Sequence, residues 1–199
     1  MNEKKVLSWV AHTDKKVLDR MYPDKLREDY IRPSYLDIIA QTAIVTSKRS
    51  ACMHYEVGAV IFHEGTHILS SGYNGPARGD VNPREAGCAR VVDGKLEEGK
   101  GFCRGSHAEL NAINNLTVST RGFKDVRMMT TLHPCNNCAK QIVNKGIEHV
   151  YYIWEYGRES FVTDYLMRLG VKVEYYMSPF LEEWIKVNKY DSVGARMSR

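Results

Sequence analysis

The chain has 199 residues, of which 43% are hydrophobic and 26% are charged. This balance is typical of a globular protein with one real core, and it excludes disordered and fibrous chains. The net charge is +4 at pH 7, from 28 basic and 24 acidic residues. Because the two signs are mixed along the chain, the excess is too diffuse to indicate nucleic-acid binding.

Neither a secretory signal nor a membrane span is expected. No apolar segment follows the basic N-terminus, and no stretch approaches the roughly 18 uninterrupted apolar residues that a membrane helix needs. We therefore predict a cytoplasmic location, where cysteines are thiols or metal ligands rather than disulfides. The chain has five cysteines, an odd number, which also argues against a complete disulfide framework.

The first half of the chain divides into four parts. Residues 1–33 are charged with a weak helical pattern, and we interpret them as a helical N-terminal extension that packs on the core. Ser34 and Asp37 resemble a capping box, and an i, i+3, i+4 apolar stripe then predicts a helix ending near residues 47–50. Strands are predicted at residues 57–62 and 67–73, joined as a hairpin. Residues 74–105 are rich in Gly, Pro and charge, and a long segment without regular structure is usually functional.

The second half alternates helices with strands. Helices are predicted at residues 107–116, 135–144 and 160–169, and strands at residues 126–132, 149–154 and 171–176. Single helices between strands indicate βαβ crossovers and a parallel part of the sheet. We therefore predict an α/β fold, a mixed sheet of about five strands flanked by helices, with its domain at residues 34–176. A C-terminal helix and tail at residues 177–199 should pack on the same domain.

Two short segments carry the chemistry: H-A-E at residues 107–109 and P-C-N-N-C at residues 134–138. Each segment alone has an ordinary interpretation, as a solvated His–Glu pair or as a redox or structural C-x-x-C. Together, at the starts of two successive helices, they match the zinc-deaminase signature H-x-E…P-C-x-x-C. The pair therefore predicts a catalytic zinc (Zn²⁺) site.

The residue types explain this prediction. Cys135 and Cys138 share one face of a helix's first turn, where backbone N–H groups and the helix dipole favour thiolates. With His107 they give three protein ligands, which leaves a fourth position for water, as in catalytic zinc sites. Glu109 would move protons between the water, the base and the departing ammonia. Positions i and i+2 of a helix point about 200° apart, so His107 must precede the regular helix.

These segments resemble the deoxycytidylate (dCMP) deaminases of the zinc-dependent cytidine-deaminase superfamily, of the late-competence bacterial and phage type. The resemblance covers residues 34–176 and includes V-G-A-V-I at residues 57–61, G-Y-N-G at residues 72–75 and C-A-K at residues 138–140. It implies a three-layer α/β/α cytidine-deaminase-like fold and hydrolytic deamination of dCMP to dUMP with release of ammonia, feeding thymidylate synthesis. It also implies a homo-oligomer, commonly a hexamer, and dCTP and dTTP as effectors.

The family further implies three substrate contacts. Asn74 resembles the residue that holds the deoxyribose and phosphate, Arg49 resembles a phosphate contact, and Tyr156 resembles the aromatic residue that lines the pyrimidine pocket. A guanidinium suits phosphate by its charge and its fork of donors. Alternatives stay open, since Arg49 also fits an ordinary cation at a helix C-terminus and Tyr156 is one of 12 tyrosines.

Cys52, Cys88 and Cys103 correspond to positions where many relatives bind a second, structural zinc. The chain departs from those relatives at Pro83, where they commonly present a thiol or an imidazole. Three ligands without a fourth make a poor structural site, unless His54 substitutes. A second zinc at these three cysteines and its absence are both open interpretations.

Two other functions compete with dCMP deamination. The nearest is the same chemistry on another cytosine nucleotide, such as a C5-modified dCMP or a ribonucleotide. A non-catalytic, zinc-stabilised binding module is disfavoured by Glu109, because a structural site has no use for an unligated carboxylate beside the metal. Editing of a polynucleotide needs a basic path for the strand, so we expect no nucleic-acid partner and no membrane partner.

Overall fold

The computed structural model describes two isolated positions near the N-terminus and four longer stretches: Lys16, Arg20, 31–65, 67–96, 103–156 and 161–190. The chain divides into two units, Met1–Arg32 and Pro33–Arg199. Lys16 and Arg20 are helical, but the packing predicted for the N-terminal extension lies outside the described residues. In the described part of the chain, no helix has the length and apolar character needed to cross a membrane.

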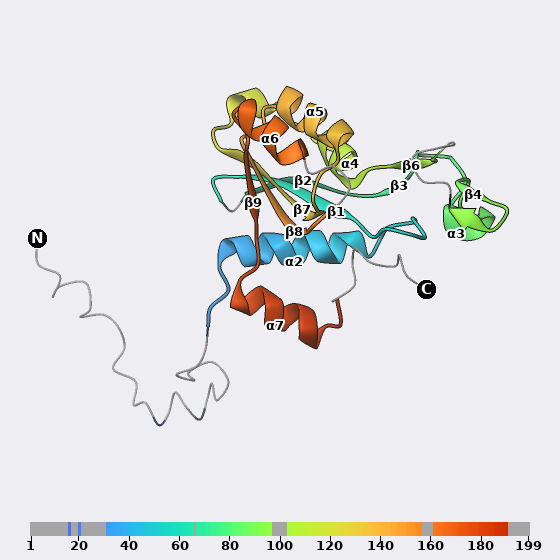
Figure 1. Ribbon diagram of the computed structural model, residues 1–199. Helices are drawn as coiled ribbons and strands as arrows, with labels where there is room; N and C mark the ends of the chain where they lie inside the picture. The colour runs from blue at the N-terminus through green and yellow to red at the C-terminus, as the bar shows by residue number, and fades with distance from the viewer. Residues whose placement is uncertain are drawn as a thin grey trace, which may run out of the picture. The chain divides into compact units, whose positions relative to one another are not determined.

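The second unit is built on a mixed sheet of five strands in the order β2-β1-β7-β8-β9 (Figure 1). Strand β1 pairs antiparallel with β2 and β7, whereas β7, β8 and β9 run parallel. The five strands have these bounds: β1 Gly58–His63, β2 His67–Tyr73, β7 Val126–Leu132, β8 His149–Trp154 and β9 Lys172–Tyr175. The predicted mixed α/β sheet is confirmed.

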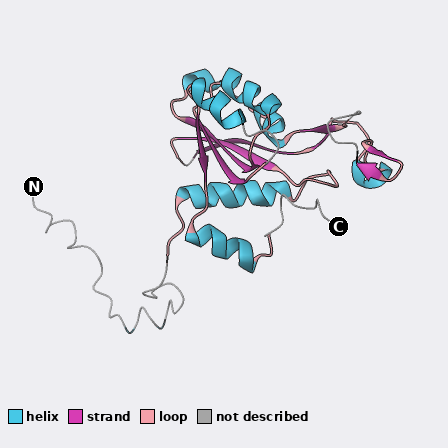
Figure 2. Cartoon of the chain, in the orientation of Figure 1, coloured by secondary structure: helices cyan, strands magenta, loops and turns pink. Residues whose placement is uncertain are grey.

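Helices cover both faces of the sheet (Figure 2). On one face lie α2 (Tyr35–Ser47) and α7 (Pro179–Val187), and on the other lie α4 (Ala108–Asn114), α5 (Asn136–Lys145) and α6 (Phe161–Arg168). A short 3₁₀ helix, η2 (Thr120–Gly122), precedes β7. Helices α5 and α6 make the two crossovers of the parallel strands, so the chain forms the three layers that the sequence predicted.

The core consists of two apolar clusters, one on each side of the sheet. Ala59 and Ile61 of β1 belong to the cluster under α4, α5 and α6, whereas Val60 and Phe62 belong to the cluster under α2 and α7. Successive side chains of a strand point to opposite faces, so a strand that is covered on both sides reads as a continuous apolar run. This is why residues 57–62 look uniformly hydrophobic.

Two glycines let helices lie directly on strands. A Cβ atom on Gly58 would stand 2.1 Å from the carbonyl oxygen of Ala43 in α2. A Cβ atom on Gly72 would stand 2.3 Å from the backbone nitrogen of Ala112 in α4. These separations are far below van der Waals contact, so only glycine allows α4 to pack this closely on β2.

The segment at residues 74–105 is more ordered than the sequence predicted. It contains β3 (Gly75–Pro76), α3 (Pro83–Ala86), β4 (Val91–Val92), β5 (Lys95–Leu96) and β6 (Gly105–Ser106). Strand β3 pairs with β6, and β4 pairs with β5, both antiparallel. The pairing of Gly75 with Ser106 brings the two ends of the segment together, because the backbone groups of one end satisfy those of the other.

Candidate active site

Both signature segments place one side chain just before a helix and another in its first turn. His107 precedes α4 with an extended backbone (φ −75°, ψ 153°), and Glu109 lies in the first turn. Cys135 precedes α5 in the same way (φ −80°, ψ 168°), and Cys138 follows in that helix. His107 therefore precedes the regular helix, as it must if the side chains of His107 and Glu109 are to face the same metal site.

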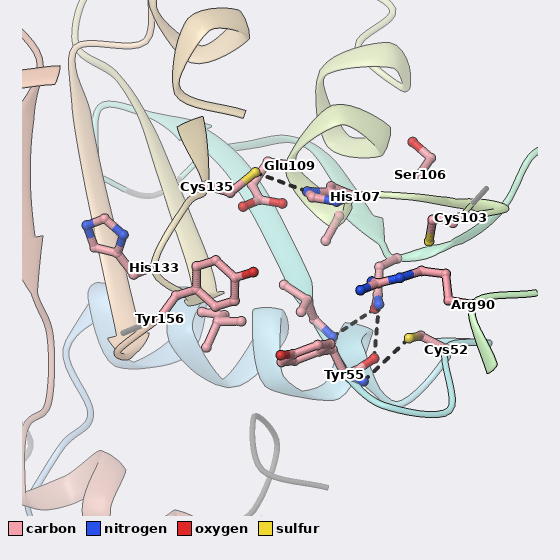
Figure 3. Close-up of a pocket in the computed structure, with 15 residues that line it drawn as sticks. Cys52, Tyr55, Arg90, Cys103, Ser106, His107, Glu109, His133, Cys135 and Tyr156 are labelled. Atoms are coloured by element: carbon pink, nitrogen blue, oxygen red, sulfur yellow. Dashed lines mark hydrogen bonds between the residues drawn. The ribbon is translucent and has the colours of Figure 1, made fainter. Parts of the chain in front are cut away.

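The three predicted metal ligands converge (Figure 3). The Nδ1 atom of His107 lies 3.3 Å from Cys135 Sγ and 3.3 Å from Cys138 Sγ, and the two sulfurs are 3.7 Å apart. For a tetrahedral zinc with usual bond lengths, neighbouring ligands would stand about 3.8 Å (S–S) and about 3.6 Å (N–S) apart. The donor set and its spacing therefore fit a zinc ion held between His107, Cys135 and Cys138.

The charges of these side chains also suit a metal. The hydrogen bond that Cys135 shares with Cys138 lowers the pKa of Cys135 to about 4. Its hydrogen bond with Cys135 raises the pKa of His107 to about 9, and the same neighbour raises the pKa of Cys138. Without metal, Cys135 is a thiolate beside an imidazolium. Because zinc takes thiolates and neutral imidazole, its binding must release protons from His107 and Cys138.

Glu109 stands beside the ligands without belonging to their cluster. Its side chain is only 4% exposed, and its carboxylate lies next to Cys135 and His107 (Figure 3). Burial raises the pKa of Glu109, because a carboxylate loses hydration inside the protein. A raised pKa makes the carboxylate a better proton acceptor, and the carboxyl group can return the proton in a later step.

These groups open into a cavity of about 130 Å³ whose lining includes Asn74 and Tyr156, both predicted from the sequence. Asn74 is fixed at both ends of its amide: Oδ1 accepts from the N–H of Val57 (2.8 Å), and Nδ2 donates to the carbonyl oxygen of Tyr55 (2.9 Å). The ring of Tyr156 meets that of Tyr55 edge-on at 6.2 Å. Tyr156 follows β8 and Cys135 follows β7, so the cavity opens where two parallel strands end, a usual place for ligands.

Arg49 does not line this cavity. It lines a separate, larger hollow together with Lys48, Arg78 and Arg84. The chain turns immediately after α2, where the N–H of Arg49 donates to the carbonyl oxygen of Thr46 (3.1 Å). The phosphate contact that the family resemblance implies for Arg49 therefore stays a prediction.

Cys52, Cys88 and Cys103 gather around a small cavity of about 30 Å³. Among the described residues, two groups bring three metal-binding atoms within 4.8 Å of one another, and these cysteines form neither. Pro83 is part of the cavity lining and His54 is not. Cys52 Sγ instead accepts from the backbone N–H groups of His54 (3.5 Å) and Tyr55 (3.4 Å).

The second group with three close ligand atoms is His63, Glu64 and His67, at the turn between β1 and β2. It lies at the end of β1 away from the cavity, and His67 and Glu64 are exposed. No role was predicted for His63 or His67 from the sequence, and their positions assign them none in the site.

The cavity lining also includes His133, which the sequence places near the site, and side chains that sequence reasoning missed, among them Tyr55 and Arg90. His133 is buried, with Nε2 2.8 Å from Thr163 Oγ1, and its position next to Pro134 was its signal. The sequence contains no signal for Arg90, because a single arginine in a long charged segment matches no motif. Its side chain nonetheless extends into the cavity (Figure 3).

Comparison with known proteins matches the model of the cytidine and deoxycytidylate deaminase zinc-binding region to residues 35–154. The chain is 32% identical to deoxycytidylate deaminase of Schizosaccharomyces pombe over 158 residues, which are 78% of this chain and 48% of that protein. It is 35% identical to the human deoxycytidylate deaminase over 133 residues, which are 65% of this chain and 68% of that protein. The chain thus spans about half the length of the first of these curated relatives.

Among solved structures, the chain resembles the dCMP deaminase of the cyanophage S-TIM5, determined in complex with dCMP and dUMP. The TM-score is 0.59 at 30% identity, covering 74% of this chain and 100% of that one. The region that the family model matches, residues 35–154, contains both signature segments and all three converging ligands. The resemblance found in the sequence is confirmed: the chain belongs to the cytidine and deoxycytidylate deaminase family.

Proposed function

We propose that this protein hydrolyses dCMP to dUMP and ammonia, and so feeds thymidylate synthesis. The observation that carries this proposal is the convergence of His107, Cys135 and Cys138 beside the buried carboxyl group of Glu109. Three protein ligands are the pattern of a catalytic zinc site. Relatives named deoxycytidylate deaminase, and a structural neighbour solved with dCMP and dUMP, support this choice of substrate.

His107 Nδ1 and the two thiolates would hold the zinc. When bound, the metal acts as a Lewis acid that makes water a nucleophile at neutral pH. The protein's own part is to supply two thiolates and a neutral imidazole at fixed positions. The starts of α4 and α5 do this, because each helix holds its ligand against the sheet.

Glu109 would carry the protons of the reaction. It accepts one from the attacking water as the oxygen bonds to C4 of the cytosine, and it passes a proton to the ring nitrogen N3. As the C4–N bond breaks, Glu109 delivers a further proton from the new C4 hydroxyl to the amine, which leaves as ammonia. Burial raises the pKa of Glu109, which helps the carboxyl group to hold the proton between its acceptance and its return.

Asn74 and Tyr156 would hold the rest of the nucleoside. Within the described residues, the two hydrogen bonds of Asn74 leave one Nδ2 hydrogen and one Oδ1 lone pair for the sugar. Tyr156 offers an aromatic wall next to Val57 and Leu132. These apolar surfaces suit a flat pyrimidine ring, and the fixed amide suits the deoxyribose.

We propose one zinc ion for each chain. The cavity of Cys52, Cys88 and Cys103 has Pro83 where a fourth ligand would be needed, and its sulfurs do not converge as those of the first site do. These residues do not fit a closed structural zinc site. The second zinc expected from the family is therefore not included in the proposal.

The predicted effectors dCTP and dTTP have a candidate site in the hollow that contains Arg49. Four cations line it, Lys48, Arg49, Arg78 and Arg84, against the single carboxylate of Glu56. Its volume is about 780 Å³. An excess of positive charge around an open hollow suits a triphosphate. The hexameric assembly and the cytoplasmic location stay predictions.

The test is ammonia release from a panel of cytidine, deoxycytidine, CMP, dCMP, dCTP and 5-substituted dCMP. We expect dCMP to have the highest kcat/KM. A higher value for CMP or for a 5-substituted dCMP would move the assignment to another cytosine nucleotide. If no compound released ammonia from zinc-loaded protein, the non-catalytic binding module would replace the enzyme.

A further inference from the structure

The active-site cavity has a single strongly basic side chain in its described lining. Arg90 is the only lysine or arginine among the residues that surround it. The side chain is half-buried and extends into the cavity (Figure 3). Arg49 lines a different hollow, so Arg90 is the cation that this lining offers to a substrate's phosphate.

The position of Arg90 fits the length of a nucleotide. In Figure 3, Arg90 lies with Cys52 and Cys103 at one side of the cavity, whereas Tyr156 and His133 lie at the other. The base has to present its amine to Glu109, and its phosphate stands a sugar's length from the ring. A base between Glu109 and Tyr156 therefore directs the phosphate toward Arg90.

We infer that Arg90 binds the 5′-phosphate of the substrate and sets the preference for a nucleotide over a nucleoside. This inference rests on the proposed deamination of a cytosine nucleotide. A guanidinium matches a phosphate group with two parallel N–H donors and a permanent positive charge. In a half-buried position, this charge is less screened than a surface charge would be.

The three-cysteine cavity holds the segment that carries Arg90. Cys88 and Ala89 line that cavity, and the next residue, Arg90, lines the active site, while Cys52 and Cys103 line both. The N–H of Val91 donates to the carbonyl oxygen of Cys88 (3.0 Å), which closes a turn around Arg90. The turn that carries Arg90 thus lies where the two cavities meet, with Cys52 and Cys103 in the lining of both.

The experiment compares zinc-loaded wild-type protein with Arg90→Ala, Arg90→Lys and the control Arg121→Ala, an exposed arginine of η2. Arg90→Ala should raise the KM for dCMP at least tenfold, because the charge-assisted hydrogen bonds to the phosphate are lost. In this variant, the KM for dCMP should then be close to the KM for deoxycytidine. Its kcat/KM for deoxycytidine should stay within about twofold of wild type. Arg90→Lys should keep part of the preference, and Arg121→Ala should keep all of it.

Calorimetric binding of dUMP and deoxyuridine gives a readout that needs no turnover. Arg90→Ala should weaken the affinity for dUMP at least tenfold and leave the affinity for deoxyuridine unchanged. If the alanine variant does not fold, Arg90→Gln is measured in its place. An unchanged preference for dUMP and dCMP in these variants would overturn the inference, as would a loss of that preference in Arg49→Ala instead. If the wild type bound dUMP through Arg90 but deaminated nothing, the proposed function alone would fail.

Discussion

The chain has two groups of sulfur ligands, and they are built differently. Cys135 and Cys138 stand at the start of a helix that leaves a buried strand, and His107 stands at the start of another. Cys52, Cys88 and Cys103 lie on loops. In the first group the two sulfur atoms are 3.7 Å apart. The three cysteines of the second group surround a cavity whose lining offers no fourth metal ligand. Ligands fixed by helices on a sheet form a site before metal arrives, and loop cysteines need something further to bring them together.

Matched serine variants give the largest expected contrast between these groups. Cys135→Ser should lose the bound zinc, and kcat/KM for dCMP should fall by more than about 10⁴-fold, since the metal and the groups it organises act together. Cys88→Ser should keep one zinc and most of its turnover. Metal analysis and steady-state kinetics on purified protein provide the measurement. Two zinc ions in the wild type and one in Cys88→Ser would show that the loop cysteines do bind metal.

A change at Glu109 separates metal binding from proton transfer. Glu109→Gln preserves the size of the side chain but cannot accept or return a proton, so kcat should fall by about 10⁴-fold, the upper end for general acid–base catalysis. Zinc content and dUMP affinity should stay close to wild type. A variant that retained more than a tenth of wild-type turnover would remove Glu109 from the role of proton shuttle.

The pH dependence of zinc binding follows from the directions of the pKa shifts. In the metal-free protein the pKa of His107 is raised to about 9, and that of Cys138 is raised as well. Both protons must leave when zinc binds, so affinity should increase with pH below about 9, at least tenfold for each pH unit. Competition with a chelator at pH 6, 7 and 8 measures this. An affinity that did not change over that range would mean that the ligands are already deprotonated in the free protein.

The smallest expected effect concerns the support of His107. Gly72→Ala would place a Cβ atom 2.3 Å from Ala112 in α4, so the helix must move away from β2. We expect the free energy of unfolding to fall by about 1–3 kcal/mol, as for other overpacked sites, with weaker zinc binding because α4 positions His107. Gly122→Ala is the control, since nothing lies within 4 Å of its added Cβ. Urea denaturation compares the two, and equal stability would contradict the tight packing.

Sequence patterns predicted the fold well, since β1 is buried on both faces and appears as a continuous apolar run, whereas α5 buries one face that repeats at the helical period. The metal triad was equally accessible, because H-x-E and C-x-x-C fix their geometry within one helical turn. The surfaces that the two arginine side chains line could not be predicted in this way. Arg49 and Arg90 lie in turns whose side-chain directions depend on pairings between distant segments, and no local pattern encodes them. Likewise, the positions of Cys52, Cys88 and Cys103 could be identified from sequence, but the distances between them could not.

The pairing of β3 with β6 has a consequence for how this protein can vary. Gly75 and Pro76 pair with Ser106 and Gly105, so the connection between these two pairs is closed at its base. Doubling the length of such a loop costs only about 0.6 kcal/mol. Residues can therefore be added in the turn of the β4–β5 hairpin at residues 93–94, past Arg90, while Asn74 and His107 stay where they are. The turn of this hairpin is a natural position for grafting a foreign peptide or an affinity tag into the protein.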